Sequence, residues 1–313
     1  MKQPYTAPTR EQSWVYFNGK VCQYQDVHLG LMTHALHYGT GVFEGIRAYW
    51  SAETSQLYAF RMAEHFKRMS DNAKILRMKL PVPIEQLCEI TVELLRKNAW
   101  QEDVYVRPIV FKGDEVIGVR LHDLKDSFGI YTAAMGNYVE LGGLRCMVSS
   151  WRRIDDNAAP ARAKITGIYV NGALAKSEAL ENGYDEAIFL NQDGHVCEGS
   201  AENIFIVRDG AFITPPETEN ILEGITRETL IELVEKEMGK KVVQRRIDRS
   251  ELYIAEEVFF CGTGAQVAPV VEIDRRMIGD GKTGPMTAQL QKLYLDICKG
   301  AAPKYSAWLT PIY

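Results

Sequence analysis

The chain has 313 residues, and 46% of them belong to hydrophobic types, so it can bury one large core or two smaller ones, and we expect two domains. Its formal net charge of -5 gives no general attraction to nucleic acid or to an anionic membrane. The first residues lack an apolar signal core, and no apolar run reaches the ~18 residues of a membrane span, so a cytoplasmic location is expected. The six cysteines lie far apart without a C-x-x-C pair, which argues against a disulfide framework and a structural zinc site.

The first part of the chain combines short strands with two amphipathic helices. Residues 14–26 alternate around Asn18-Gly19, a pair typical of two-residue hairpin turns. Apolar residues recur at helical spacing from Met62 to Leu76, and a second helix is predicted from about Pro83 to Asn98. The next segment, VYVRPIVFKG, is predicted to form a strand. Because Tyr105 and Arg107 are two residues apart on this strand, their side chains leave the same face and can enter one pocket.

A domain boundary is predicted at residues 134–143, where strand-like alternation gives way to glycine and polar residues. We therefore expect a small α/β domain over residues 1–133, an interdomain loop over 134–143 and a larger domain over 144–313.

The stretch from Ala161 to Asn203 carries the residues best suited to chemistry. Lys164 lies among small and apolar residues, Tyr169 follows five residues later, and Glu198 is expected at a sheet edge between two hairpins. A lone lysine is most often a solvated surface charge. A lysine that attacks an aldehyde, however, must be partly neutral near pH 7, and this requires burial or a cationic neighbour. A carboxylate such as Glu198 can hold a proton on a pyridine nitrogen, which makes that ring a strong electron acceptor.

Two glycine-bearing turns resemble anion sites. The first, LEGITR, opens the helix that begins near Thr226, and the second, CGTGAQ, follows a short strand. Backbone N–H groups at a helix start carry partial positive charge and can bind a phosphate. A helix cap and an ordinary turn are the simpler alternatives for these two segments.

These segments together resemble the fold type IV pyridoxal phosphate enzymes, and most closely the branched-chain amino acid aminotransferases. The resemblance rests on HALHYGTGVFEGIRAY, EHFKRMSDNAKIL, the stretch around Lys164, CEGSAEN, GITR and GTGA, in that order along the chain. It implies an α/β (α+β) fold with a small α/β domain and a larger domain built from a mainly antiparallel sheet or barrel with helices. It also implies pyridoxal 5'-phosphate as cofactor.

The resemblance assigns a role to each candidate residue. Lys164 would be the catalytic residue, forming the Schiff base with the cofactor. The cofactor would also be held by Arg68, Ile225, Thr226 and Thr263 at its phosphate, by Tyr169 at its phenolic oxygen and by Glu198 at its ring nitrogen. The substrate would be bound by Tyr38, Phe43, Gly45, Tyr105, Arg107, Met135, Gly264 and Ala265. Met135 stands where many relatives have a tryptophan, a difference that bears on substrate range.

Other functions fit the sequence less well. Ser70-Asp71-Asn72 and Lys282-Thr283-Gly284 match two motifs of penicillin-recognising serine enzymes, but the nucleophile motif S-x-x-K is absent from the sequence. A non-catalytic protein of this fold would not need the set Lys164, Tyr169 and Glu198. Within the family, D-amino acid aminotransferases, (R)-selective amine transaminases and aminodeoxychorismate lyases share the cofactor half and remain alternatives.

The expected reaction is a reversible transfer of the amino group from L-leucine, L-isoleucine or L-valine to 2-oxoglutarate, by a ping-pong mechanism. The expected partners are these small molecules and further copies of the chain in a homodimer or hexamer, with no nucleic acid and no membrane. The loop from Gly113 to Val119 is the candidate for a contribution to a neighbouring subunit's pocket.

Overall fold

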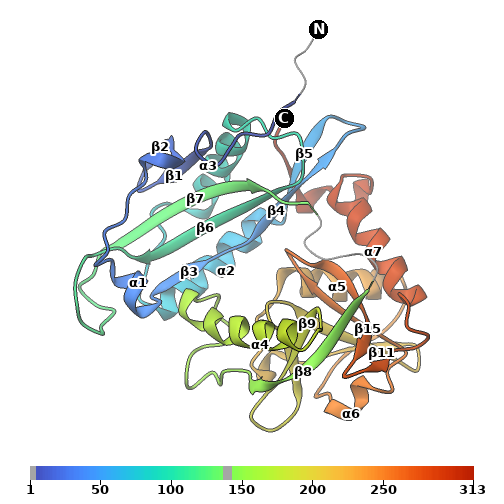
Figure 1. Ribbon diagram of the computed structural model, residues 1–313. Coiled ribbons are helices and arrows are strands. Elements are labelled where there is room, and N and C mark those ends of the chain that lie inside the picture. Colours follow the sequence, from blue (N-terminus) through green and yellow to red (C-terminus); the bar gives the residue numbers. More distant parts are fainter. Residues whose placement is uncertain (1–4, 137–142) are drawn as a thin grey trace. The chain divides into compact units, whose positions relative to one another are not determined.

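The computed structural model describes residues 5–136 and 143–313 (Figure 1). The chain divides into two compact units. The first unit holds residues 5–136, 164–167 and 296–313, and the second holds 143–163 and 168–295. The sequence-based division into 1–133, 134–143 and 144–313 stays a prediction, and residues 137–142 of the expected loop lie outside the described residues.

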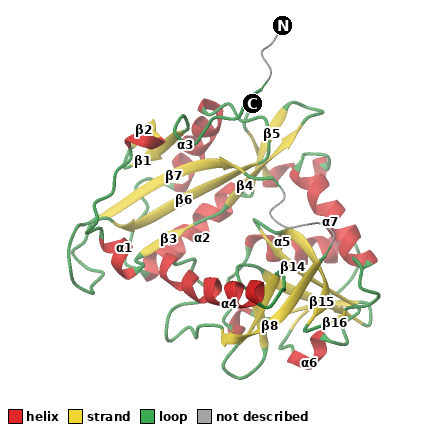
Figure 2. Ribbon diagram, in the orientation of Figure 1, coloured by secondary structure: helices red, strands yellow, loops and turns green. Residues whose placement is uncertain are grey.

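The first unit is built on an antiparallel sheet with strand order β17-β5-β4-β6-β7-β1-β2, and β3 also pairs with β6. Its strands are β1 (Trp14–Phe17), β2 (Lys20–Gln23), β3 (Gly41–Phe43), β4 (Ile46–Ser51), β5 (Gln56–Phe60), β6 (Val104–Lys112), β7 (Asp126–Ala134) and β17 (Leu309–Pro311). Its helices are α1 (His34–Tyr38), α2 (Met62–Ile75) and α3 (Ile84–Lys97). The long strands β6 and β7 form the centre of this sheet (Figure 2).

Local sequence explains these elements. Asn18 and Gly19 adopt positive φ angles of 44° and 87°, as a tight hairpin turn requires, and the predicted hairpin is confirmed as β1 and β2. The predicted helical period is confirmed in α2, which buries Met62, Phe66, Met69 and Ala73. Helices α2 and α3 lie together on one side of the sheet (Figure 1). Along β6, Val104 and Val106 are fully buried, whereas Tyr105 and Arg107 alternate with them and therefore leave the opposite face.

The second unit contains a sheet that closes on itself. The strands are β8 (Leu144–Arg152), β9 (Glu186–Leu190), β10 (Val196–Gly199), β11 (Asn203–Arg208), β12 (Ala211–Thr214), β13 (Val242–Gln244), β14 (Glu257–Gly262), β15 (Gln266–Ile273) and β16 (Arg276–Met277). The path β10-β9-β8-β15-β14-β11 returns to β10 through an antiparallel pairing of β10 with β11. Helices α4 (Tyr169–Glu181), α5 (Ile225–Lys236), α6 (Arg249–Leu252) and α7 (Pro285–Cys298) surround it, although the last residues of α7 belong to the first unit.

Closure of this sheet corrects one expectation. The hairpins at Asp193-Gly194 and Asp209-Gly210 are confirmed as β9–β10 and β11–β12. Glu198 nevertheless does not lie at a sheet edge, because β10 pairs with β9 on one side and with β11 on the other. Two successive hairpin patterns predict their own turns, but they do not predict that the first and last strands of a sheet will meet.

The interior of the closed sheet is apolar. Large side chains such as Ile188, Ile204, Ile206 and Phe260 are fully buried there. Among the described residues, no helix has both the length and the apolar character needed to cross a membrane. All six cysteines are free thiols in the structure.

Candidate functional site

Lys164 is held in the first unit by contacts to the end of β3. Its carbonyl oxygen accepts a hydrogen bond of 3.1 Å from the backbone N–H of Phe43, and Ile165 forms an isolated β-bridge with Val42. The Nζ atom of Lys164 lies 5.1 Å from the centroid of the Phe43 ring. A cation over an aromatic face is attracted by the ring, so Phe43 limits where the amine can move.

A close approach of two glycines brings the loop that carries Lys164 to this place. A Cβ atom on Gly39 would lie 2.5 Å from the Cα atom of Gly167, and Gly39 also has a φ angle of 63°. The hydroxyl of Thr166 donates to the carbonyl oxygen of Gly39 at 2.8 Å. Any side chain at position 39 would push the lysine loop away from β3.

The structure brings four predicted substrate residues together beside Lys164 in this unit. Arg107 donates a hydrogen bond of 2.7 Å from Nη2 to the hydroxyl of Tyr105. Its guanidinium carbon lies 4.3 Å from the centre of the Phe43 ring. Gly45 leaves room for the phenol, because a Cβ atom there would lie 2.1 Å from Oη of Tyr105. The predicted shared face of Tyr105 and Arg107 is therefore confirmed.

Tyr38 and Met135 occupy other positions in the first unit. The Tyr38 hydroxyl accepts a hydrogen bond of 3.1 Å from the backbone N–H of Gly118, and its ring packs on His34 at 4.6 Å. Met135 directly follows β7, and its N–H donates to the carbonyl oxygen of Asp103 at 2.9 Å. The substrate-pocket roles of Tyr38 and Met135 stay predictions.

Arg68 on α2 belongs to a buried polar cluster that the sequence analysis missed. Its guanidinium donates from Nε and Nη2 to the two carboxylate oxygens of Glu44, at 2.7 and 2.8 Å. The same carboxylate accepts a hydrogen bond of 2.8 Å from Nδ1 of His65. An available signal was Glu44 itself, because an acidic residue inside the apolar run GVFEGI requires a buried partner.

Glu198 is held in the second unit by donors on both of its carboxylate oxygens. Arg153 contacts Oε1 at 2.8 Å, while Oε2 accepts from Nδ2 of Asn203 at 3.2 Å and from the backbone N–H of Leu222 at 3.0 Å. Glu198 and Arg153 are both buried. Charge-assisted hydrogen bonds of this kind favour the ionised carboxylate. Arg153 and Asn203 were missed from the sequence because their contacts to Glu198 depend on the tertiary fold.

The two predicted phosphate turns also lie in the second unit. Helix α5 starts at Ile225, and its N-cap residue Gly224 provides no side-chain hydrogen bond to the first turn. A Cβ atom on Gly224 would lie 2.0 Å from Oδ1 of Asn203, so this turn requires glycine. Thr226 is buried in the first turn of α5. The other turn joins β14 to β15 and contains the three predicted residues Thr263, Gly264 and Ala265. Tyr169 is the first residue of α4.

Comparison with known proteins identifies the family. Residues 41–273 match the family described as class IV aminotransferases. A probable branched-chain-amino-acid aminotransferase of Aquifex aeolicus is 50% identical over 301 residues, which is 96% of this chain and 97% of that relative. The chain belongs to the class IV aminotransferases. The branched-chain-amino-acid aminotransferase of Pseudomonas aeruginosa is 41% identical over 95% of this chain and 96% of that relative.

Solved class IV aminotransferases confirm the fold class. The branched-chain aminotransferase of Thermoproteus uzoniensis, solved with norvaline, is similar with a TM-score of 0.92 and 42% identity over 96% of this chain and 99% of that chain. The branched-chain enzyme of the source abbreviated T.th., solved with N-(5'-phosphopyridoxyl)-L-glutamate, has a TM-score of 0.91 and 40% identity over the same shares. This T.th. enzyme was also solved with 4-methylvaleric acid. The resemblance drawn from the sequence motifs is therefore confirmed.

A further carboxyl group of this aminotransferase lies near Glu198. Burial raises the pKa of Glu202 to about 8, and the charge of Glu186 raises it further, against an opposing effect from Lys176. Oε2 of Glu202 accepts a hydrogen bond of 3.0 Å from the N–H of Ala201. At pH 7 Glu202 is therefore mainly protonated, and its carboxyl adds little negative charge beside Glu198.

Replacing Glu202 by glutamine is expected to change how stability depends on pH. The free carboxyl titrates near 4.5, so between this value and about 8 the folded wild type binds one more proton than the unfolded chain. Its stability therefore falls as pH rises through this window. Glutamine resembles the protonated carboxyl, so the variant should match the wild type at pH 6 and exceed it by about 2 to 3 kcal/mol at pH 9. Denaturant unfolding at both pH values measures this, and parallel pH curves would contradict it.

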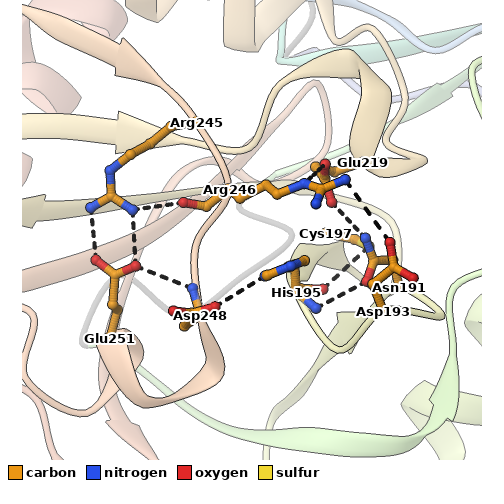
Figure 3. Close-up of polar contacts among 9 residues, drawn as sticks. All are labelled: Asn191, Asp193, His195, Cys197, Glu219, Arg245, Arg246, Asp248 and Glu251. Carbon is orange, nitrogen blue, oxygen red and sulfur yellow. Dashed lines mark hydrogen bonds and ion pairs between the residues drawn. The ribbon is translucent and has the colours of Figure 1, made fainter.

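A separate polar network in the second unit contains none of the predicted site residues (Figure 3). Glu251 accepts two hydrogen bonds from Arg245, at 2.9 and 2.7 Å, and one from Arg208 at 2.8 Å. The buried carboxylate of Glu219 accepts from Nε of Arg246 at 2.8 Å, and His195 lies 3.1 Å from Asp248. These contacts tie the β9–β10 turn to the segment before α6, which indicates a structural role.

Proposed function

We propose that this class IV aminotransferase transfers the amino group of L-leucine, L-isoleucine or L-valine to 2-oxoglutarate, with pyridoxal 5'-phosphate as cofactor. The observation that carries the proposal is the grouping of Lys164, Phe43, Tyr105 and Arg107 in one unit. The named relatives are branched-chain enzymes. One of the solved enzymes, that of T.th., was obtained with a glutamate derivative of the cofactor and with a branched acid.

The residues present fit the proposed cofactor. Glu198 is a buried carboxylate kept charged by Arg153, which suits a protonated pyridine nitrogen. The first turn of α5 has no side-chain cap, which suits a phosphate at Ile225 and Thr226. In this proposal Thr263 and Arg68 would also bind the phosphate, and Tyr169 would donate to the phenolic oxygen. The cofactor, when bound, would supply the electron acceptor that stabilises negative charge at the substrate α-carbon.

The chain's own residues would perform the remaining steps. Lys164 would bind the cofactor covalently and, once displaced by the amino acid, would take the proton from the α-carbon and return it to the C4' carbon of the cofactor. Glu198 would hold the proton on the ring nitrogen. Tyr38, Phe43, Gly45 and Met135 would border the substrate side chain in this proposal. Gly264 and Ala265 would offer backbone N–H groups to the α-carboxylate.

Arg107 would resolve the conflict between the two substrates. The pocket must accept the apolar side chain of leucine and then the carboxylate of glutamate, although burying an unpaired charge costs several kcal/mol. Nε of Arg107 is buried and, within the part of the chain that the structure describes, has no hydrogen-bond partner. Its guanidinium can therefore pair with a carboxylate, while the aliphatic stem borders an apolar side chain.

The proposal is tested by comparing amino donors at steady state. We expect L-leucine, L-isoleucine and L-valine to react with 2-oxoglutarate, and D-alanine and (R)-1-phenylethylamine to react at least about a hundredfold more slowly, because hydrogen-bonded and charged contacts fix the handedness of the bound donor. A preference for D-alanine or for the (R)-amine would replace the proposal with one of the other specificities in the family.

We also infer that the chain self-associates into a homodimer or hexamer. Three apolar side chains of the first unit, Leu31, Ile117 and Val119, are 80%, 85% and 87% exposed. An apolar cavity of about 620 Å³ in the same unit is lined by residues that include Tyr24, Leu29, Leu31, Leu36, Ile109 and Phe111. Exposed apolar surface of this kind is typical of subunit interfaces. The loop from Gly113 to Val119 remains the candidate for the contribution to a neighbour's pocket.

Light scattering combined with activity measurements tests the self-association. We expect the active species to be a dimer or a larger oligomer, and we expect Ile117→Asp to shift it toward the monomer, because a carboxylate would have to be desolvated in the interface. A fully active monomer would contradict the inference. A cytoplasmic location, without nucleic-acid or membrane partners, is part of the same proposal.

A further inference from the structure

The buried cluster of Glu44, His65 and Arg68 contains two polar groups to which the proposed reaction gives no role. The side chain of Glu44 is completely buried directly after β3, that of His65 is 2% exposed, and that of Arg68 is 11% exposed. A buried carboxylate, imidazole and guanidinium are costly to desolvate, so their arrangement needs a physical reason.

The Glu44 carboxylate is saturated with donors. Its Oε1 accepts from Nε of Arg68, and its Oε2 accepts from Nη2 of Arg68, from Nδ1 of His65 and from the N–H of Gly45 at 3.2 Å. Burial alone would raise the pKa of Glu44, but the charge of Arg68 and the hydrogen bond from His65 hold it well below its usual range. Glu44 is therefore ionised, and Nδ1 of His65 must carry the proton because an ionised carboxylate can only accept.

Two contacts to one carboxylate fix the plane of the Arg68 guanidinium. A bidentate pair sets both the position and the orientation of the planar group, whereas a single contact leaves it free to rotate. His65 lies three residues before Arg68 on α2, so both side chains project from the same face of the helix toward Glu44. Burial lowers the pKa of His65, so its imidazole is neutral at pH 7 and acts as a hydrogen-bond donor without adding charge.

We propose that Glu44, supported by His65, is a positioning residue that orients the Arg68 guanidinium to receive the phosphate group of the cofactor. This inference rests on the proposed role of Arg68. Glu44 acts through Arg68 and touches no reacting atom. The orientation matters because a phosphate, like a carboxylate, is bound most tightly by a guanidinium whose plane is already set.

Binding of cofactor to the apoenzyme tests the proposal without any use of turnover. Glu44→Gln keeps the shape of the side chain but loses the charged fork, so we expect the Kd for pyridoxal 5'-phosphate to rise about 10- to 100-fold. Pyridoxal, which has no phosphate, should bind to this variant and to the wild type within about threefold, because its contacts do not involve Arg68. His65→Asn should retain a donor near Nδ1 and bind cofactor like the wild type, whereas His65→Leu should bind it more weakly.

A matched control is Glu251→Gln. Glu251 also accepts four hydrogen bonds, three of them from Arg245 and Arg208 and one from the N–H of Asp248, but it belongs to the separate network of Figure 3. Its replacement should lower stability and leave cofactor affinity unchanged. If Glu44→Gln left the Kd unchanged, tightened it, or weakened pyridoxal to the same extent, the positioning role would be overturned.

A double variant separates this inference from the role of Arg68, and it serves if Glu44→Gln alone folds poorly. Arg68→Met should weaken binding of the phosphorylated cofactor, and adding Glu44→Gln to it should change the Kd by less than about twofold, because the residue through which Glu44 acts is gone. A further large loss in the double variant would overturn the inference about Glu44. Wild-type affinity in Arg68→Met alone would instead remove the proposed phosphate role of Arg68.

Discussion

Replacing Lys164 by alanine is expected to lower turnover by roughly a thousandfold or more, because the ε-amine supplies both the covalent attachment to the cofactor and the proton transfer at the α-carbon. The loss should be catalytic and not a loss of cofactor, since the proposed phosphate contacts of Arg68, Ile225, Thr226 and Thr263 are untouched. Absorbance and fluorescence titrations should therefore show bound pyridoxal 5'-phosphate in the inactive variant.

Lys176 provides the control for this experiment. Its Nζ donates to Glu186 at 2.6 Å and to the carbonyl oxygen of Asp185 at 2.6 Å, which gives it a structural role on α4. Lys176→Ala should keep turnover within about tenfold of the wild type, because the chemistry does not use this amine. Comparable losses in both variants would mean that Lys164→Ala acts through the fold and not through the reaction.

Replacing Arg107 by methionine should separate the two halves of the reaction. The half-reaction with leucine needs only the apolar border of this side chain and should stay within about tenfold. The half-reaction with 2-oxoglutarate loses a buried charged pair worth about 3 kcal/mol and should fall about a hundredfold or more. Single-turnover rates for each half measure this directly.

Tyr105→Phe gives a graded version of the same test. It removes the hydrogen bond of 2.7 Å between the Tyr105 hydroxyl and Arg107 but keeps the ring. The 2-oxoglutarate half-reaction should weaken by about threefold to tenfold, as expected for one lost hydrogen bond, and the leucine half-reaction should change less. If Arg107→Met lowered both halves equally, Arg107 would hold the fold or a shared carboxylate and would not select the acceptor.

Local features of the fold could be predicted because their causes are local. The turn at Asn18-Gly19 and the apolar spacing of α2 are set by neighbouring residues, and both appear in the structure as expected. Strand β17 could not be predicted in this way, because Leu309 pairs with Phe60 and Pro311 with Tyr58, far apart in sequence. The closing pair of β10 and β11 is likewise a property of the whole sheet.

The candidate site shows the same division. The motifs pointed to Lys164, Glu198 and Arg68 because these residues stand in recognisable sequence surroundings. The groups that hold two of these side chains in place, Glu44 at Arg68 and Arg153 at Glu198, lie 24 and 45 residues away in the sequence and become visible only once the chain is folded. The sequence identified the reactive groups, and the structure identified their supports.

The attachment point of the cofactor is the most direct test of the account. Sodium borohydride should fix pyridoxal 5'-phosphate to the lysine that holds it, and peptide mapping by mass spectrometry then locates the modified residue. We expect the label on the peptide that contains Lys164, with no label on the peptide that contains Lys176. Label on Lys176, or a protein that takes up no label after incubation with the cofactor, would contradict the central assignment.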